Sequence, residues 1–146
     1  MKEKVCTQFK NKAFGTRFEQ EFAQILADQG FWVHRLQDNK NGQPFDIIAA
    51  KNGHTYAIDC KDCQSDVFLL KRMEENQRNA MLLWKECGNR EPVFAVKYSD
   101  DEIWLFGYSV LCYLESKGWK QIRKEDAETA GMKLEEFWEY ENCDWE

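Results

Sequence analysis

Two aspartates and a lysine, Asp46, Asp59 and Lys61, are the residues of this sequence whose types and spacing could carry chemistry. They lie in two runs, Phe45–Ala50 and Thr55–Lys61, that are rich in residues typical of β-strands. The segment between the runs contains the pair Asn-Gly. This pair is the strongest short-range signal for a β-hairpin, because a type I′ turn needs a positive φ at both central positions. The sequence therefore predicts a hairpin that carries two carboxylates and an ammonium group near its open end.

The register of the predicted hairpin places the two aspartates opposite each other. With Asn52 and Gly53 as the turn residues, Asp46 pairs with Asp59, and their Cβ atoms are expected about 5 Å apart. Like charges in this position destabilise a sheet unless another group offsets them, and carboxylate oxygens are natural ligands of Mg²⁺. Because side chains alternate along a strand, Lys61 lies on the same face as Asp59. The hairpin therefore predicts a metal site with a lysine beside it.

Two further polar side chains lie on the apolar stripes of predicted helices. Glu19 belongs to a stripe with i, i+3, i+4 and i+7 spacing, and Gln77 is the only polar member of a second stripe. Glu19 either snorkels outward or reaches into a site against the sheet, and Gln77 needs a hydrogen-bond partner if it is buried. Taken singly, Glu19 is equally a surface residue, Gln77 a satisfied core glutamine and Lys61 a solvated charge. The apolar members of the stripes are Phe22, Ala23 and Leu26, and then Leu70, Met73, Met81 and Trp84.

Hydrophobic periodicity and turn residues predict the order α-β-β-β-α-β-β. Gly30 and Gly88 mark the ends of the two long helices. The expected fold class is α/β, with a mixed central sheet flanked by helices and a C-terminal extension of two short helices after Tyr108. The predicted helices cover about 14–29 and 70–87, the predicted strands cover 31–36, 45–50, 55–61, 92–98 and 103–106, and a loop covers 62–66.

Length and charge narrow the class of protein further. A chain of 146 residues fits a single domain with a core of its own. Its net charge is −6, and residues 107–146 hold 5 Lys and Arg against 10 Asp and Glu. This balance disfavours a diffuse electrostatic grip on nucleic acid, but it leaves room for a local basic surface outside the last quarter. No signal peptide and no apolar run of about 18 residues is present, so a cytoplasmic protein without a membrane partner is expected.

Six cysteines are present, and two of them, Cys60 and Cys63, form a CxxC pair. With no signal peptide, reduced thiols are expected. A zinc site needs a second pair of ligands at comparable spacing, and the chain offers only His34, His54 and scattered cysteines. The pair is therefore interpreted as two small residues near a strand end, with a zinc or redox role as the alternative.

The motifs also support a resemblance to a known family. Pro44-Phe45-Asp46 followed by Asp59-Cys60-Lys61 resembles the PD-(D/E)xK nuclease motif, with a Phe after the Pro and an Asp in the second acidic place. Gly15-Thr16-Arg17-Phe18-Glu19 is similar to the G-x-x-x-E pattern of the same superfamily. Over about residues 10–106 the chain resembles Holliday-junction resolvases of the archaeal and RecU-like type. The resemblance implies a restriction-endonuclease-like core (α-β-β-β-α-β) over this range, followed by an acidic extension over about 107–146.

The resemblance implies a metal-dependent endonuclease that hydrolyses DNA phosphodiester bonds. Asp46 and Asp59 would hold Mg²⁺, for which Mn²⁺ could substitute, together with the backbone carbonyl of Cys60. Glu19 would bind the metal directly or through water. Lys61 would orient the attacking water or stabilise the charge that develops on the phosphate.

The resemblance also implies partners. Gln77 looks like the glutamine that many of these nucleases carry on the helix after the motif. Branched DNA is the expected substrate, and a homodimer is expected because a junction has two strands to cut symmetrically. Candidates for contacts with backbone phosphates are Lys10, Lys12, Arg17, Arg35, Lys40, Lys71 and Arg72.

Three alternatives stay open at this point. The same fold could cut duplex DNA, flap DNA or RNA, because substrate shape is recognised by surface geometry. The chain could be an inactive nuclease fold that binds another protein through its acidic extension. It could also be a zinc or redox protein built on the CxxC pair.

Overall fold

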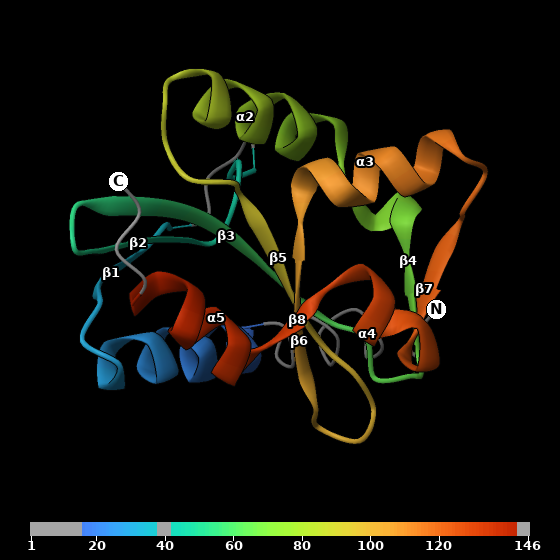
Figure 1. Cartoon of the computed structure of the whole chain (residues 1–146), viewed down its shortest axis with the longest axis horizontal. Coiled ribbons are helices and arrows are strands. Elements are labelled where there is room, and N and C mark those ends of the chain that lie inside the picture. The colour runs from blue at the N-terminus through green and yellow to red at the C-terminus, as the bar shows by residue number, and fades with distance from the viewer. Residues whose placement is uncertain (1–15, 38–41, 143–146) are drawn as a thin grey trace, which may run out of the picture.

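The computed structural model describes residues 16–37 and 42–142, which form two β-sheets with helices around them (Figure 1). The larger sheet has six strands in the order β1-β2-β3-β5-β6-β8, and the smaller one pairs β4 with β7. The strands are β1 (Trp32–Arg35), β2 (Ile47–Lys51), β3 (His54–Asp62), β4 (Val67–Leu69), β5 (Val93–Lys97), β6 (Ile103–Gly107), β7 (Gln121–Arg123) and β8 (Met132–Lys133). The helices are a first one described over 16–28, then α2 (Glu75–Glu86), α3 (Tyr108–Ser116), α4 (Ala127–Ala130) and α5 (Leu134–Asn142), with 3-10 turns η1 (Leu70–Arg72) and η2 (Lys124–Asp126).

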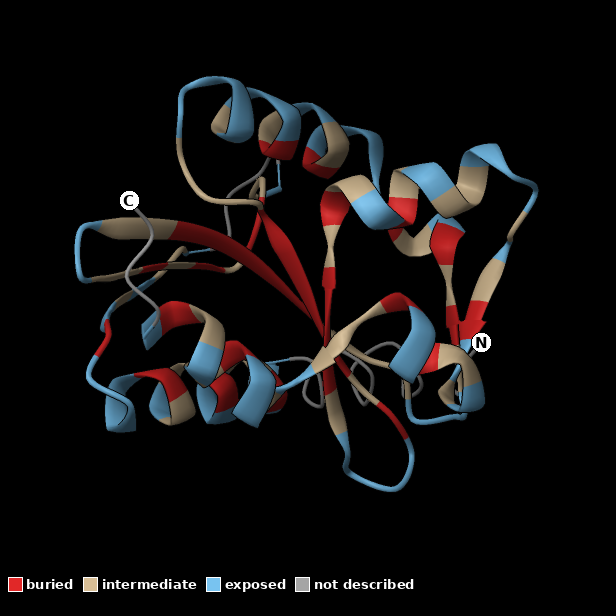
Figure 2. Ribbon diagram, viewed as in Figure 1, coloured by how far each residue is buried: buried red, intermediate tan, exposed pale blue. Residues whose placement is uncertain are grey.

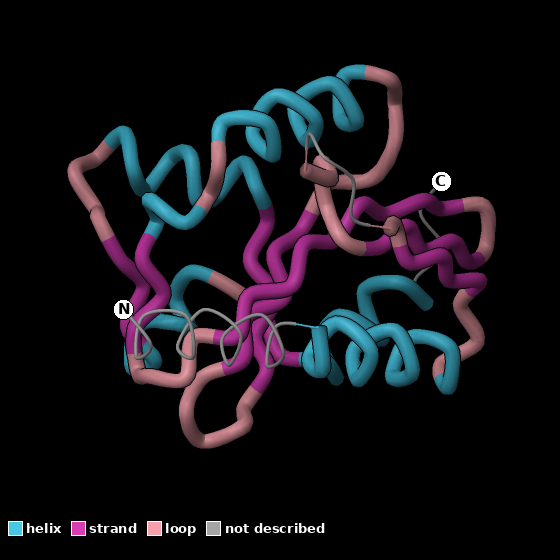
Figure 3. Tube along the Cα trace, turned by 180° about the vertical axis from the view of Figure 1, so that it is seen from behind, coloured by secondary structure: helices cyan, strands magenta, loops and turns pink. Residues whose placement is uncertain are grey.

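The larger sheet is mixed, as predicted. Strands β3 and β5 run parallel, and every other neighbouring pair is antiparallel. The parallel pair requires a crossover, and the segment with η1 and α2 supplies it. Helices α2 and α3 lie on one side of the sheet, and the first helix and α5 lie on the other (Figures 1 and 3).

The hairpin of β2 and β3 has the register that the Asn-Gly pair predicts. Ile47 pairs with Ile58 along the ladder, and the turn residues Asn52 and Gly53 have φ angles of 54° and 79°. Both values are positive, as a type I′ turn requires. The ladder begins at Ile47, so Asp46 lies one residue before the paired strand.

The two faces of the sheet bury separate apolar clusters, and the middle of β3 and most of β5 and β6 are buried between them (Figure 2). The α2 side contains Phe68, Phe94 and Phe106, and the other side contains Phe22 and Leu26 of the first helix. Burying one large apolar side chain stabilises a fold by about 1.5–3 kcal/mol. These clusters therefore hold β3 in place, and β3 carries both Asp59 and Lys61 near its C-terminal end.

The helix predicted over 70–87 is interrupted in the structure. Residues 70–72 form the 3-10 turn η1, and α2 begins only at Glu75. Gln77 causes part of this break, because its Oε1 accepts the backbone N–H of Glu74 at 3.3 Å and so caps the new helix start. Leu70 and Met73 before the interruption and Met81 after it are buried, so the apolar stripe continues across it.

The segment after Tyr108 contains helices, as expected, but also two strands that the sequence did not predict. Strand β7 pairs with β4 in the small sheet, and β8 extends the large sheet beside β6. Three helices, α3, α4 and α5, are present instead of two. Strand β4 itself lies just after the predicted loop at 62–66. Among the residues that the structure describes, no helix is both long and apolar enough to cross a membrane.

Candidate active site

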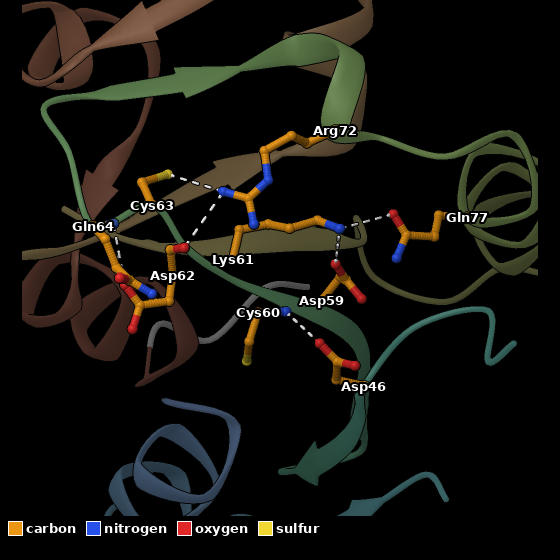
Figure 4. A pocket seen from close by; sticks show the side chains of 9 residues that line it. All are labelled: Asp46, Asp59, Cys60, Lys61, Asp62, Cys63, Gln64, Arg72 and Gln77. Carbon is orange, nitrogen blue, oxygen red and sulfur yellow. Dashed lines mark hydrogen bonds and ion pairs between the residues drawn. The ribbon is translucent and has the colours of Figure 1, made fainter. Parts of the chain in front are cut away.

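A cavity of about 420 Å³ lies where β2 begins and β3 ends (Figure 4). Side chains from β3, the loop after it, the η1 turn and α2 all line it. The hairpin register and the crossover bring these segments together, because β3 carries the site residues and the chain returns over them through α2. The lining residues are Asp46, Asp59, Cys60, Lys61, Asp62, Cys63, Gln64, Arg72 and Gln77.

Asp46 is held just before β2 by hydrogen bonds of its main chain and its side chain, and its carbonyl oxygen accepts the N–H of Leu36 at 2.9 Å. Its backbone N–H donates to the carbonyl of Ile58 at 3.1 Å. Its carboxylate Oδ2 accepts the backbone N–H of Cys60 at 2.8 Å, and Oδ1 accepts Nε2 of Gln43 at 2.5 Å. The carboxylate is therefore bound on both oxygens and lies against the end of β3.

Asp59 is a buried carboxylate, and its side chain is only 2% exposed. Burial, and after it the negative charge of Asp46, raise the pKa of Asp59 to about 8 against the opposing effect of Lys61. Lys61 Nζ lies 3.1 Å from Asp59 Oδ2. The predicted proximity of the two aspartates and the lysine is thus present, although Asp46 lies outside the ladder.

Lys61 connects the strand to α2. Its Nζ donates to Gln77 Oε1 at 3.3 Å, and its side chain is 11% exposed. Gln77 is buried, and its side-chain oxygen accepts two hydrogen bonds, one from Lys61 and one from the backbone N–H of Glu74. Gln77 therefore orients the lysine, which restricts where the ammonium group can lie in the cavity.

The structure does not bring Glu19 into this group of side chains. Its Oε1 lies 3.2 Å from Nε of Arg35, and its side chain is 13% exposed. Glu19 lies on the first helix, which packs on the face of the sheet opposite α2. Its charge still contributes to the raised pKa of the Cys60 thiol, after burial and the charges of Asp46 and Asp59.

Arg72 is the cation among the phosphate-binding candidates that lines the cavity. Its Nη1 lies 3.5 Å from both the carbonyl oxygen of Asp62 and Sγ of Cys63. Arg35 is paired with Glu19, whereas Arg17 and Lys71 are exposed and line other cavities. Lys10, Lys12 and Lys40 lie outside the described residues.

Among the described residues, the CxxC pair forms no disulfide and joins no group of three metal-ligating side chains. Cys60 and Cys63 are both free thiols, and Figure 4 shows their sulfur atoms pointing in opposite directions. Burial raises the pKa of Cys63 to about 11. A thiol with a raised pKa is a poor nucleophile and a poor zinc ligand at neutral pH. The geometry favours the interpretation as two small residues at a strand end.

The donor set can be tested against a divalent cation. Within residues 16–37 and 42–142, no three His, Cys, Asp or Glu side chains converge into a metal-binding group. Two carboxylates do meet, and Mg²⁺ commonly takes one or two carboxylates and fills its other positions with water and substrate phosphate. Among the described residues, Asp59 Oδ2 and Gln43 Oε1 are buried without a hydrogen-bond partner, although Lys61 Nζ lies 3.1 Å from Asp59 Oδ2 as an ion pair. Asp46, Asp59 and the Cys60 carbonyl therefore fit a Mg²⁺ ion that keeps several waters, without Glu19 as a direct ligand.

Sequence reasoning missed Gln43. Gln43 lies three positions before Asp46 in a polar segment, and no helical or strand periodicity distinguishes it from its neighbours. Asp62 and Gln64 were also missed as cavity-lining residues, because the sequence predicted a loop from residue 62 and a loop carries no register that would place its side chains, whereas β3 extends to Asp62.

The comparisons with known proteins agree with this geometry. The family model for archaeal Holliday junction resolvases matches residues 10–143. Among solved structures, the chain is similar to Hjc, a Holliday junction resolvase from Archaeoglobus fulgidus, with a TM-score of 0.63 and 20% sequence identity. That alignment covers 86% of this chain and 95% of the other, and it shows a shared fold. No curated protein matches the sequence at a significant level.

Proposed function

This chain belongs to the archaeal Holliday junction resolvase family, and from that premise we propose that Asp46, Asp59 and Lys61 are the residues with which it cuts DNA. Members of the family are nucleases that hydrolyse phosphodiester bonds in branched DNA, with a general dependence on divalent metal. The chain is accordingly a structure-selective nuclease of recombination and repair. Mg²⁺ as the metal, with Mn²⁺ as a substitute, is part of the proposal.

One observation carries the assignment of residues. Asp59 is buried beside the charge of Asp46, and an ammonium group lies 3.1 Å from it. A buried carboxylate beside a second, half-buried carboxylate is costly to a fold, and a bound cation would offset that cost. A cavity that opens on this pair supplies the space for a metal ion and a phosphate.

Each side chain has a separate task in this proposal. Asp46, Asp59 and the Cys60 carbonyl would hold the cation, whose chemistry when bound would be to polarise the phosphate and to activate water for attack. Lys61, oriented by Gln77, donates to the phosphate oxygens as negative charge develops on them. Arg72, on the wall of the same cavity, binds a neighbouring phosphate through its guanidinium group.

For Glu19 we propose only one of the two roles that the resemblance implied, which were to bind the metal directly or through water. The support is that Glu19 pairs with Arg35 and does not line the cavity, while its charge raises the pKa of the Cys60 thiol. We assign it a contact with the metal through water. Arg35 then neutralises the third carboxylate of the region when no metal is bound.

A homodimer is also proposed, because two symmetric cuts in a junction need two active sites. The surface that supports it lies on α2 and α3, which are adjacent in Figures 1 and 3. Large apolar side chains are exposed there, and the mass of the protein in solution, from light scattering, tests whether they are covered by a second copy. These residues are Leu82, Leu83, Val110 and Tyr113.

Cleavage of defined substrates tests the proposal. A labelled four-way junction, a matched linear duplex, a flap and an RNA duplex are incubated with the full chain and Mg²⁺, Mn²⁺ or EDTA. We expect symmetric nicking of the junction, lost in EDTA. Asp59→Ala is expected to abolish cleavage and to leave junction binding in a gel-shift assay intact, whereas Asp28→Ala, an exposed aspartate on the first helix, retains both.

The other outcomes discriminate among the alternatives. Cleavage of the duplex, flap or RNA in place of the junction keeps the site and rejects the junction as its substrate. Cleavage that persists in Asp59→Ala rejects the site. Junction binding without cleavage under any metal condition favours an inactive nuclease fold that acts as a binding module.

A further inference from the structure

Gln43 has an unusual place in the site, because it contacts a proposed metal ligand but does not line the cavity. Its Nε2 donates to Asp46 Oδ1 at 2.5 Å. The opposite oxygen of the same carboxylate, Oδ2, accepts the N–H of Cys60. Two donors from opposite sides therefore fix the plane of the Asp46 carboxylate, and only one of them comes from the backbone.

The amide of Gln43 is itself held in an unfavourable arrangement. Its Oε1 is buried and has no hydrogen-bond partner among the described residues. A buried acceptor left without a donor is costly to the fold. The amide nitrogen must face Asp46, because Oε1 in that position would repel the carboxylate. The contact with Asp46 therefore fixes the orientation of Gln43 in spite of the cost at Oε1.

The main chain of Gln43 is tied to the helix that carries Gln77. Asn76 Nδ2 donates to the carbonyl oxygen of Gln43 at 3.4 Å. Gln77, the next residue of α2, holds Lys61 on the far wall of the cavity. One helix start thus fixes both the turn that orients Asp46 and the side chain that orients Lys61.

We propose that Gln43 is a positioning residue that holds the Asp46 carboxylate in the orientation in which it binds the divalent cation. This inference rests on the function proposed above, since it needs Asp46 to be a metal ligand. Groups that hydrogen-bond to metal ligands fix the ligand orientation, and their removal typically weakens metal binding by about 10- to 100-fold. Gln43 acts through Asp46 and touches neither the metal nor the DNA.

Titration of the DNA-free protein with Mn²⁺ alone, followed by calorimetry, tests the proposal without any measurement of activity. Gln43→Ala removes the donor, and Gln43→Leu removes it while filling most of the space. We expect both to raise the Mn²⁺ dissociation constant about 10- to 100-fold. Gln24→Ala is the matched control, because Gln24 Nε2 donates to the exposed Asp28 at 2.8 Å on the first helix. Its Mn²⁺ affinity is expected to equal that of the wild type.

A second pair of variants separates orientation from general stability. Gln43→Glu places two carboxylates in contact, and the double variant Gln43→Glu with Asp46→Asn restores a donor and an acceptor with their roles exchanged. The double variant is expected to regain the unfolding temperature that Gln43→Glu loses, but not to regain Mn²⁺ binding, since a metal-binding carboxylate is gone. A purely structural role for Gln43 predicts lower unfolding temperatures with unchanged Mn²⁺ affinity.

The outcomes distinguish this inference from the function on which it rests. If Asp46→Asn loses Mn²⁺ binding while both Gln43→Ala and Gln43→Leu keep wild-type affinity, the metal site stands and the role of Gln43 is rejected. If Asp46→Asn itself binds Mn²⁺ like the wild type, the metal site and the inference both fail. Weakened binding in both Gln43 variants, with the Gln24→Ala control unchanged, supports both.

Discussion

Removing the charge of Asp46 is expected to stabilise the metal-free protein, and to do so only at neutral and alkaline pH. Asp46→Asn keeps the shape of the side chain. Its Oδ1 can still accept the N–H of Cys60, which now lies 2.8 Å from the carboxylate. Its new Nδ2 can donate to Gln43 after the Gln43 amide turns over, and the buried Oε1 then gains the donor that it lacks. The substitution thus removes a charge and preserves the hydrogen bonds.

The magnitude follows from the repulsion between the two carboxylates. Groups about 5 Å apart repel by about 3 kcal/mol at an effective dielectric constant of about 20. This energy corresponds to about 2 pH units in the pKa of Asp59. Burial and the Asp46 charge raise that pKa to about 8 in the wild type. In the variant it is expected at about 6, because burial still acts and the repulsion does not.

The sign of the pH dependence is set by proton uptake on folding. An aspartate whose pKa is raised by folding binds a proton more tightly in the native state, so stability is lost as the pH rises from the unfolded to the folded pKa. The wild type loses stability between the ordinary value of 3.8 and about 8. The variant stops losing it at about 6. The variant therefore gains nothing at pH 5, about 1 kcal/mol at pH 7 and about 3 kcal/mol at pH 9.

Thermal unfolding in EDTA at pH 5, 7 and 9 measures this effect. For a domain of this size, each kcal/mol shifts the unfolding temperature by about 2–4 °C. Asp28→Asn is the matched control, because the same chemical change at an exposed aspartate gives a shift that does not vary over this pH range. A gain in unfolding temperature that is equal at all three pH values, or absent at pH 9, would refute the inference that Asp46 and Asp59 repel each other. Added Mg²⁺ is expected to stabilise the wild type more than the variant, since the variant lacks one ligand.

Three further substitutions test the roles of individual residues. Lys61→Met is expected to lower kcat by about 10²–10³ with junction binding retained, and a loss of binding instead would make Lys61 a phosphate contact only. Gln77→Ala removes the acceptor for both Lys61 and the N–H of Glu74, so we expect a loss of about 1 kcal/mol in urea unfolding together with a lower kcat. A lower unfolding free energy with an unchanged kcat would mean that Gln77 acts only as a helix cap. Gly131→Ala places a Cβ 2.5 Å from the Leu105 carbonyl oxygen, and the unfolding free energy is expected to fall by about 1–3 kcal/mol. An unchanged value would mean that β8 moves freely away from β6.

The central hairpin was predictable because two independent patterns specify it. The Asn-Gly pair fixes the turn, and the alternation along Thr55–Lys61 fixes which side chains share a face. The structure confirms the register from Ile47 onward, and it places Asp46 beside the ladder. A one-residue slip would have reversed the faces, so the proximity of Asp59 and Lys61 follows once the turn is recognised.

The parts that escaped prediction lack such redundancy. Strands β4, β7 and β8 have three, three and two residues, too few to show an alternating pattern. The break before α2 was hidden because Leu70 and Met73 before it and Met81 after it are all buried. Gln43 and Glu19 depend on tertiary contacts with Asp46 and Arg35, which no local spacing encodes.

The acidic extension argued against a DNA substrate. The position of its charged residues removes this conflict. Every residue that lines the proposed active site falls between Asp46 and Gln77, so residues 107–146 add no charge to the cavity wall. One of the extension's acids, Glu141, is buried and accepts hydrogen bonds from the Tyr56 hydroxyl and from Nδ1 of His54. This acid fastens α5 to β3, on the face of the sheet opposite α2. Net charge is a property of the whole chain, whereas a phosphate responds to the charges within about a Debye length, roughly 8–10 Å, of where it binds. The overall value of −6 therefore does not exclude a DNA-binding cavity lined by Lys61 and Arg72.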